Sequence, residues 1–246
     1  MDRMIYTAMN GAKQVMQRQA YNNNNLANVS TAGFRRDFDI VRSMQLYGPG
    51  YQSRVYAQET TAGVDHESGR IMQTGRDLDL AIQGEGYIAI QAPDGTEAYT
   101  RAGDLKIDSA GFLKTGAGHS VMGNGGLVSI PPFEKLEIGG DGTISVRPLG
   151  QTAATLAAVD QIKLVKPDSK DLVKGSDGLL RHRNGEVQAP DASVTVVSGA
   201  IESSNVNAVD ALVNMIELTR QFELNVKLME RADANNRASA TLMRFS

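Results

Sequence analysis

Residues 208–243 constrain the fold more than any other part of the chain. Their apolar positions recur at alternating steps of three and four residues, the spacing of a coiled-coil seam, for about five heptads. The seam comprises Ala208, Leu212, Met215, Thr219, Phe222, Val226, Met229, Asp233, Asn236, Ala240 and Met243. No Pro or Gly interrupts the stretch, and Asn207 caps its start. The pattern predicts a helix about 55–60 Å long, either a core helix of its own protein or one that needs partners.

A second amphipathic segment occupies the other end of the chain. The same alternation of steps runs through Ile5, Met9, Ala12, Met16, Gln19, Asn23 and Leu26. The asparagines at 22–25 are poor helix formers, so packing has to hold this helix or the N-terminus frays. We expect the two terminal helices to pair as a coiled coil. The shorter one covers only part of the longer one, whose uncovered seam then needs neighbouring subunits.

The sequence between the helices has the character of an antiparallel β domain. Short apolar runs alternate with Asp-Gly and Asn-Gly turn signals at Asp94, Asp141, Asp177 and Asn184. One segment, 152–160, is compatible with a short helix. We therefore predict an α+β fold with paired terminal helices, an inserted antiparallel β domain and extended connectors. The expected divisions are an N-terminal helix at 1–30, a connector at 31–76, the β domain at 77–188, a return connector at 189–205 and the C-terminal helix at 206–246.

Composition and motifs argue against enzymatic, metal-binding and cofactor-binding functions. The chain has 246 residues and no Cys, and its three His residues are far apart in the sequence. Asp77 and Asp79 lie two residues apart, a spacing compatible with paired carboxylates, but we expect them to lie at the solvated end of a strand; Glu85 is the third candidate for acid–base chemistry. Arg35 and Arg36 likewise favour a solvated basic face over a phosphate contact.

Charge and hydropathy narrow the partners and the route of export. The net charge of −3 favours neither nucleic acid nor an anionic membrane surface. No apolar run approaches the roughly 20 residues that span a bilayer, so we expect no membrane insertion. The first ten residues contain no apolar signal-peptide core, so export without a cleavable signal peptide is expected.

Three segments together resemble the axial proteins of the bacterial flagellum. Residues Asn25, Leu26, Ala27 and Asn28, followed by Thr31, Gly33, Phe34 and Arg35, resemble the signature ANxxTxGF[KR] of rod, hook and hook-associated proteins. The stretches 80–87, 99–103 and 111–113 are similar to the β domain of rod and hook proteins. The stretches 199–206 and 220–223 are similar to the family's C-terminal segment. Tyr87 stands where Phe is usual in the family.

The resemblance implies a structural function. Family members are exported by the flagellar type III apparatus and assemble helically, with themselves and other rod proteins, into the torque-transmitting rod that spans the periplasm. The eight residues from Asn25 to Arg35 named above would form the assembly motif. The assembly seam would comprise Leu212, Met215, Phe222, Val226, Met229, Asp233, Asn236 and Met243.

Chain length and the opening residues favour a proximal-rod member of this family. The distal-rod paralogue is the first alternative. An oligomeric module whose β domain binds the cell wall is the second, and a wall-cleaving enzyme that uses Asp77, Asp79 or Glu85 is the third.

Overall fold

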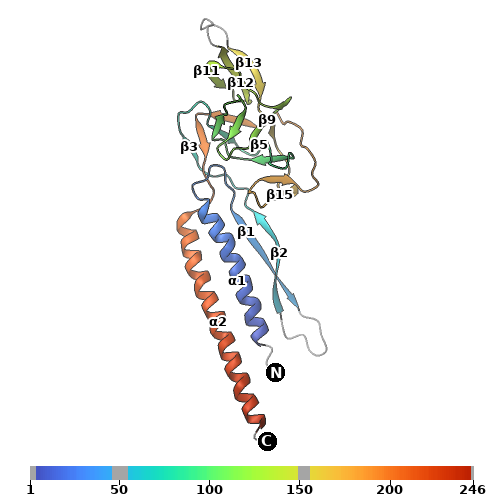
Figure 1. Ribbon diagram of the computed structural model, residues 1–246, viewed down its shortest axis with the longest axis vertical. Coiled ribbons are helices and arrows are strands. Elements are labelled where there is room, and N and C mark those ends of the chain that lie inside the picture. The colour runs from blue at the N-terminus through green and yellow to red at the C-terminus, as the bar shows by residue number, and fades with distance from the viewer. Residues whose placement is uncertain (1–3, 46–54, 149–155, 245–246) are drawn as a thin grey trace. The chain divides into compact units, whose positions relative to one another are not determined.

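A computed structural model describes residues 4–45, 55–148 and 156–244 (Figure 1). The chain forms two compact units. The first contains Met1–Asn28, Arg36–Asp65 and Val206–Ser246, and the second contains Val29–Arg35 and His66–Asn205. The chain therefore passes between the units four times.

The first unit is built on the two terminal helices, α1 (Met4–Ala27) and α2 (Ala208–Arg244). They pack side by side and run antiparallel (Figure 1). Near the end of α1, the Asn22 side-chain amide donates to the carbonyl of Ala211, which lies in the first turn of α2. At about 1.5 Å per residue, the 37 residues of α2 span about 55 Å and the 24 residues of α1 about 36 Å. The shorter helix therefore covers only part of the longer one.

A two-stranded antiparallel hairpin completes the first unit. Strand β1 (Asp37–Gln45) pairs with β2 (Val55–Val64), with an irregularity between Phe38 and Ile40. Just outside the strands, Arg36 closes the open end of the hairpin. Its carbonyl accepts from the amide of Asp65, and its Nε donates to the Asp65 carboxylate at 2.7 Å. The segment expected to be an extended connector thus contains a paired hairpin.

The second unit consists of short antiparallel strands. Its largest sheet has the order β15-β16-β6-β5-β9-β8-β7, with β10 paired to β9 and β14 paired to β5. Those strands are β5 (Tyr87–Gln91), β6 (Glu97–Thr100), β7 (Leu105–Ile107), β8 (Leu113–Thr115), β9 (Ser120–Gly123), β10 (Gly126–Leu127), β14 (Leu164–Val165), β15 (Leu172–Lys174) and β16 (Leu180–His182). A short 3-10 helix, Ser169–Asp171, precedes β15.

Three smaller sheets complete this unit. They are formed by β11 (Phe133–Ile138), β12 (Thr143–Pro148) and β13 (Ala157–Gln161), by β4 (Leu80–Gln83) with β17 (Thr195–Ser198), and by β3 (Ile71–Gln73) with β18 (Ala200–Glu202). One continuous apolar core lies beneath the strands, and its fully buried members include Leu80, Ile88, Ile90, Leu105, Leu113, Val121, Val128 and Ile144.

Three of the four predicted turn signals join paired strands. Asp94, Asp141 and Asp177 precede glycines with positive φ and lie between β5 and β6, β11 and β12, and β15 and β16. The Asp141 carboxylate accepts hydrogen bonds from the amide and hydroxyl of Thr143, and these bonds lower its pKa below the ordinary value. The turn is thereby fixed by its own side chain.

The coarser part of the predicted fold is confirmed: the structure is α+β, the terminal helices pack together, and the β region is antiparallel. The short helix expected at 152–160 is wrong where the structure describes it. There, Ala157–Gln161 is strand β13, held by pairing with β12, and residues 149–155 lie outside the described residues. No helix among the described residues is long and apolar enough to cross a bilayer.

Candidate assembly site

The N-terminal motif spans the end of α1 and the first segment of the second unit. Asn25, Leu26, Ala27 and Asn28 close the helix, and the amide of Asn28 donates to the carbonyls of Asn24 and Asn25. Thr31 is exposed and Phe34 is half-buried. Gly33 and Arg35 are buried. Much of the motif therefore faces inward.

Asn25 joins the end of α1 to the start of β1 within the first unit. Its side-chain NH2 donates to the carbonyl of Asp37, and its oxygen accepts from the amide of Asp37, both at 2.8 Å. One side chain thus acts as the hydrogen-bonding partner of an extended backbone. This explains why an asparagine, a poor helix former, occupies a buried helical position.

Gly33 turns the chain against Arg101 inside the second unit. Its φ of +65° lies in the left-handed region, and a Cβ there would meet the Arg101 carbonyl carbon at 2.1 Å. Only glycine fits both restrictions. The Gly33 amide donates to the carbonyl of Glu202 at 2.8 Å, which joins the N-terminal motif to the C-terminal one.

Phe34 and Lys174 hold the next part of the same segment. The Lys174 ammonium lies 3.9 Å from the centre of the Phe34 ring and donates to the Arg35 carbonyl at 2.8 Å. The Phe34 carbonyl in turn accepts from the amide of Asn205. Strand β15, which carries Lys174, therefore fixes the segment that leads into Arg35.

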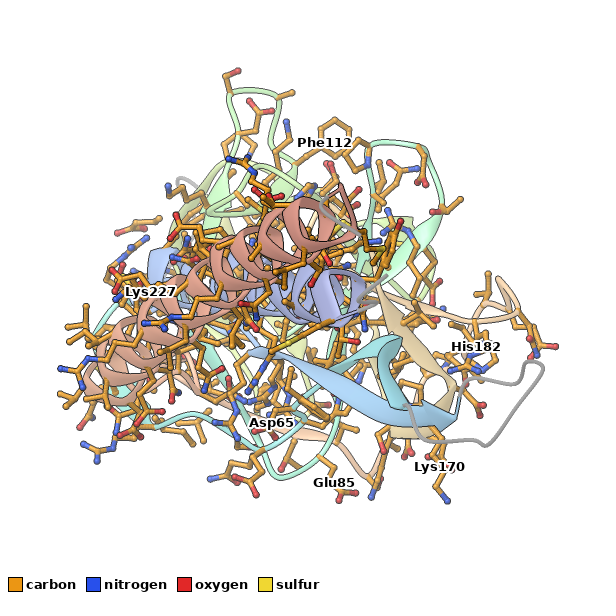
Figure 2. All side chains as sticks on the ribbon, turned by 90° about the horizontal axis from the view of Figure 1, so that it is seen from below. Asp65, Glu85, Phe112, Lys170, His182 and Lys227 are labelled. Carbon is orange, nitrogen blue, oxygen red and sulfur yellow. The ribbon has the colours of Figure 1, made fainter. Side chains whose placement is uncertain are left out.

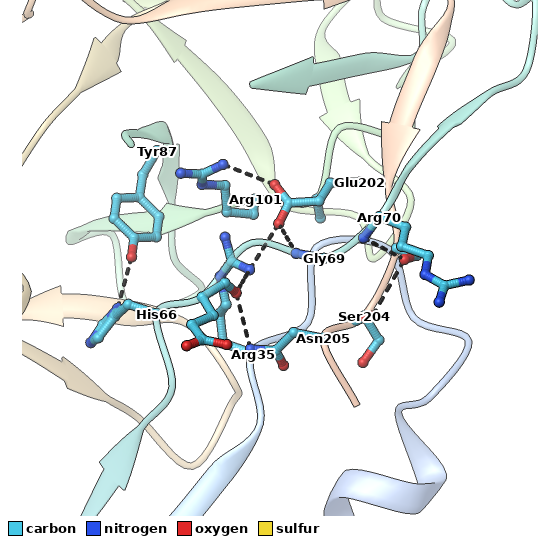
Figure 3. A network of polar contacts seen from close by, with 12 residues as sticks. Arg35, His66, Gly69, Arg70, Tyr87, Arg101, Glu202, Ser204 and Asn205 are labelled. Carbon is cyan, nitrogen blue, oxygen red and sulfur yellow. Dashed lines mark hydrogen bonds and ion pairs between the residues drawn. The ribbon is translucent and has the colours of Figure 1, made fainter. Parts of the chain in front are cut away.

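Arg35 lies in a buried ionic cluster with Glu202 and Arg101 (Figure 3). Its Nη1 is 2.8 Å from Glu202 Oε1, and the Nη1 of Arg101 is 2.9 Å from Oε2. Arg35 also donates to the Glu67 carbonyl. The side chains of Arg35 and Glu202 are only 3% and 1% exposed, so the expectation that Arg35 lies on a solvated face is wrong. The shared carboxylate offsets part of the cost of burying the two guanidiniums.

Tyr87 borders this cluster. The Arg101 guanidinium lies 5.3 Å from the centre of the Tyr87 ring, and the Tyr87 hydroxyl is 2.8 Å from His66 Nδ1. Burial raises the pKa of Tyr87 above its ordinary value, while the charges of Arg35 and Arg101 oppose the increase. The phenol therefore stays protonated at neutral pH and contributes a hydroxyl and a ring face to the cluster.

The predicted seam of α2 coincides in part with the observed packing face. Met215, Phe222, Val226, Met229, Asp233 and Asn236 are half-buried, whereas Leu212 and Met243 are exposed. The most buried α2 side chains are Ala211, Leu218 and Ala232. Each lies one residue before a predicted seam position. The stripe that α1 covers therefore runs through 208, 211, 215, 218, 222, 225, 229, 232 and 236.

On α1, too, buried side chains lie one residue before predicted seam positions. Ala8, Ala12 and Val15 are buried, whereas the predicted seam residues Met9 and Met16 are more than half exposed. Gly11 and Asn225 show why this register is favoured: a Cβ on Gly11 would lie 2.9 Å from the Asn225 side-chain oxygen. The helices approach each other closely where their side chains are small.

Large apolar side chains consequently face away from the helix pair. On α2 they include Val209, Leu212, Val213, Ile216, Leu224 and Leu228, and on α1 they include Tyr6, Met9 and Met16. All of them are at least two-fifths exposed. An exposed set of large apolar side chains is typical of a contact surface for another protein.

A polar pocket of about 290 Å³ also lies within the first unit. It is bordered by the end of α1, the start of β1 and the start of α2. Its lining includes Arg18, Asn22, Asp37, Asp210, Asn214 and Glu217. The mixture of amides and charges of both signs does not resemble the mainly apolar lining of a small-molecule site.

The three carboxylates considered for an enzyme do not converge. Asp77 is exposed, and Glu85 lies at the surface, where it pairs with Lys166 at 3.1 Å (Figure 2). Asp79 is buried, contrary to the expected solvated strand end: Thr74 Oγ1 donates to it at 2.6 Å, and its backbone forms an isolated antiparallel bridge with Asp104. Among the described residues, no group of three or more His, Asp or Glu side chains is arranged to hold a metal ion.

Sequence reasoning did not single out Glu202 or Arg101 as site residues. One local signal was present. Glu202 is the only charged residue in the stretch 199–206, and it shares the inward face of β18 with Ala200. An acidic residue on the buried face of a strand predicts a buried cationic partner.

Comparison with known proteins identifies relatives of both the β region and the C-terminal helix. Residues 197–242 match the family described as the flagellar basal body rod FlgEFG protein C-terminal, and residues 81–146 match the flagellar hook protein FlgE/F/G D1 domain. The rod protein FlgF of Escherichia coli K12 is 38% identical over the whole of both chains, and that of Salmonella typhimurium LT2 is 37% identical. The rod protein FlgG of Bacillus subtilis 168 is 30% identical over 94% of this chain and 95% of its own.

These matches confirm the resemblance seen in the sequence and support a structural rod subunit. They do not favour the distal-rod or cell-wall-binding alternatives. The chain belongs to the family of flagellar basal-body rod proteins, and the relatives that match its full length at 37–38% identity are named FlgF.

Proposed function

We propose that this chain is a proximal-rod subunit that packs against other rod subunits, including copies of itself, through the outward faces of α1 and α2. The observation that carries the proposal is the inverted packing of the helix pair. Small side chains such as Ala8, Ala211 and Ala232 are buried between the helices, whereas many large apolar ones, Leu212 and Ile216 among them, face outward. A pair that was the final assembled state would bury the large side chains first.

Burial of this outer face would stabilise an assembly substantially. Fully burying one Leu, Ile or Val side chain contributes about 1.5–3 kcal/mol, so the half-exposed residues of α2 each offer roughly 1 kcal/mol on docking. A face that docks on a different surface of its neighbour makes a heterologous contact, and repeated heterologous contacts build helical filaments. The exposed seam residues Leu212 and Met243 belong to this contact in our proposal.

We further propose that α1 and α2 form a coiled coil in the rod. The buried and half-buried positions of α1 run through 5, 8, 12, 15, 19, 22 and 26, an unbroken alternation of three and four residues. The α2 stripe has the same alternation. That spacing is the coiled-coil repeat and supports this geometry.

Family membership supports the remaining parts of the proposal. The rod subunit is exported by the flagellar type III apparatus without a cleavable signal peptide, lies in the basal body across the periplasm, and helps to transmit torque.

Substitution of Ile216 by Asp tests the outward face directly. Ile216 is 58% exposed, so the change should alter the free energy of unfolding of the isolated chain by less than about 1 kcal/mol. In the rod the same carboxylate would be buried against a neighbour, so we expect rod assembly and swimming to be lost. Motility in soft agar and recovery of the subunit with purified basal bodies measure the result.

Ile216→Met is the matched control, because it keeps an apolar side chain of similar volume and should swim normally. Normal swimming of Ile216→Asp would refute the proposed contact face. Substitutions at Met215 or Phe222 are less informative, because both side chains are half-buried in the isolated chain and also affect its folding.

The polar seam residues Asp233 and Asn236 are proposed to specify register. Asp233 pairs with Arg237 at 2.7 Å on a largely exposed surface, a pair that contributes little stability by itself. We expect Asn236→Leu to raise helix stability by about 0.5 kcal/mol through helix propensity. It should also lower correct rod assembly, because a buried polar seam residue selects partners. Thermal unfolding and basal-body yield measure the two effects, and unchanged assembly would count against a register role.

A further inference from the structure

Glu202 makes contacts in several directions from one buried position (Figure 3). Its Oε1 lies 2.8 Å from Arg35 Nη1 and accepts from the Gly69 amide at 2.8 Å. Its Oε2 accepts from Arg101 at 2.9 Å, and its backbone carbonyl accepts from Gly33. A single residue thus holds four others.

The contacts of Glu202 coincide with the places where the chain passes between the two compact units. The crossings lie between residues 28 and 29, 35 and 36, 65 and 66, and 205 and 206. Gly33 and Arg35 lie in the short segment between the first two crossings. Gly69 lies shortly after the third, and Glu202 itself shortly before the fourth.

Backbone and side-chain bonds reinforce the same junction inside the second unit. The Asn205 amide donates to the Phe34 carbonyl, and the Asn205 side chain donates to the Glu67 carbonyl at 3.1 Å. The Ser203 amide donates to the Arg70 carbonyl, and the Arg70 amide donates to Ser203 Oγ. The chain segments that lead out of α1 and into α2 are therefore bonded to each other within the second unit.

This arrangement has a consequence for helix pairing. About 180 residues separate the end of α1 at Ala27 from the start of α2 at Ala208, so joining the two helices would require closing a long loop. Folding of the second unit closes that loop in advance. The helices are then tethered as in a hairpin, at a high effective concentration, and the Asn22–Ala211 hydrogen bond joins residues close in the chain to the tethered ends.

We propose that Glu202 is a positioning residue that couples the folding of the second unit to the pairing of α1 and α2. The coupling runs through the covalent chain: the carboxylate fixes the ends of the segments that carry the helices. Its function depends on charge, because two buried guanidiniums share this one carboxylate. In this view, Gly33 and Arg35 act inside the subunit and are not themselves docking residues.

Hydrogen exchange on the unassembled full-length chain tests the proposal, so its outcome does not depend on whether the rod contact face is correct. Glu202→Gln keeps the shape of the side chain and removes its charge. We expect the protection factors of α1 and α2 amides to fall at least tenfold, under conditions in which strands β5, β6 and β9 stay protected.

Glu97→Gln is the matched control. Glu97 is another buried carboxylate of the second unit and pairs with Lys163 at 2.7 Å, but it contacts none of the four crossings in the described structure. Its loss should loosen the strands while the helices keep their protection. Equal loss of helix protection in both variants would overturn the proposal, because Glu202 would then act only through general stability.

A milder variant covers the case in which Glu202→Gln does not fold. Glu202→Asp retains the charge but withdraws the carboxylate by one methylene, so we expect an intermediate loss of helix protection with the strands intact. Wild-type helix protection in Glu202→Asp and in a folded Glu202→Gln would refute the proposal. Helices that are unprotected even in the wild-type chain would refute it too, because the junction would then form without pairing them.

Discussion

Replacing Gly33 with alanine is expected to lower the free energy of unfolding of the second unit by about 2–5 kcal/mol. Two costs add. A non-glycine residue in the left-handed region costs about 1–2 kcal/mol. The new methyl group would also lie 2.1 Å from the Arg101 carbonyl carbon, and relieving such an overlap by backbone movement costs about 1–3 kcal/mol. The melting temperature should fall by on the order of 10 °C.

Gly95→Ala separates these two costs. Gly95 also has a positive φ, of +84°, but a Cβ there would meet no atom within 4 Å. Its substitution should therefore cost only about 1 kcal/mol. Thermal unfolding of both variants, followed by circular dichroism, gives the comparison. Equal melting temperatures would show that the close approach of Gly33 to Arg101 is unimportant.

The sequence predicts the fold class because its patterns are local. Alternation of three and four residues identifies the helices, and Asp-Gly pairs such as Asp141 with Gly142 identify hairpins from backbone conformation alone. The failed helix at 152–160 marks the limit of such patterns. A short apolar stretch has little preference of its own, and pairing with β12 decides the structure of Ala157–Gln161.

The sequence does not decide which residues of the two helices pack together, because the predicted seam and the observed packing stripe have the same spacing and share positions. Positions 208, 215, 222, 229 and 236 belong to both seams. The two seams differ only at the positions in between, where the predicted one contains Leu212 and Met9 and the observed one contains Ala211 and Ala8. Hydrophobicity favours the larger residues, but close helix packing favours the smaller ones. The sequence of one subunit does not reveal that these large apolar residues face away from the helix pair.

The N-terminal motif was recognisable in the sequence, but the reason for its residues was not. Arg35 follows an apolar residue in a turn-rich segment and therefore resembles a surface residue. Its carboxylate partner, Glu202, lies 167 positions further along the chain. Long-range ion pairs leave no periodic signal, and their prediction requires the topology that brings β18 beside the segment 29–35.

Asn25→Ala is expected to lower the free energy of unfolding of the first unit by roughly 1.5 kcal/mol. The change removes both hydrogen bonds to the Asp37 backbone, each of which contributes about 1 kcal/mol. Alanine recovers about 0.5 kcal/mol of this through its better helix propensity. Urea unfolding followed at 222 nm measures the difference.

Substitution of the nearby Asn23 separates the loss of the hydrogen bonds from the gain in helix propensity. Asn23 lies in the same helix, but its side chain is exposed. Asn23→Ala should therefore show only the gain in helix propensity, a stabilisation of about 0.5 kcal/mol. The two substitutions are chemically identical and two positions apart, yet we expect opposite signs. If both variants shift the urea midpoint in the same direction, Asn25 does not hold β1 to α1. If the signs differ, Asn25 joins α1 to the hairpin, whereas Asn23 only lowers the helix propensity of α1.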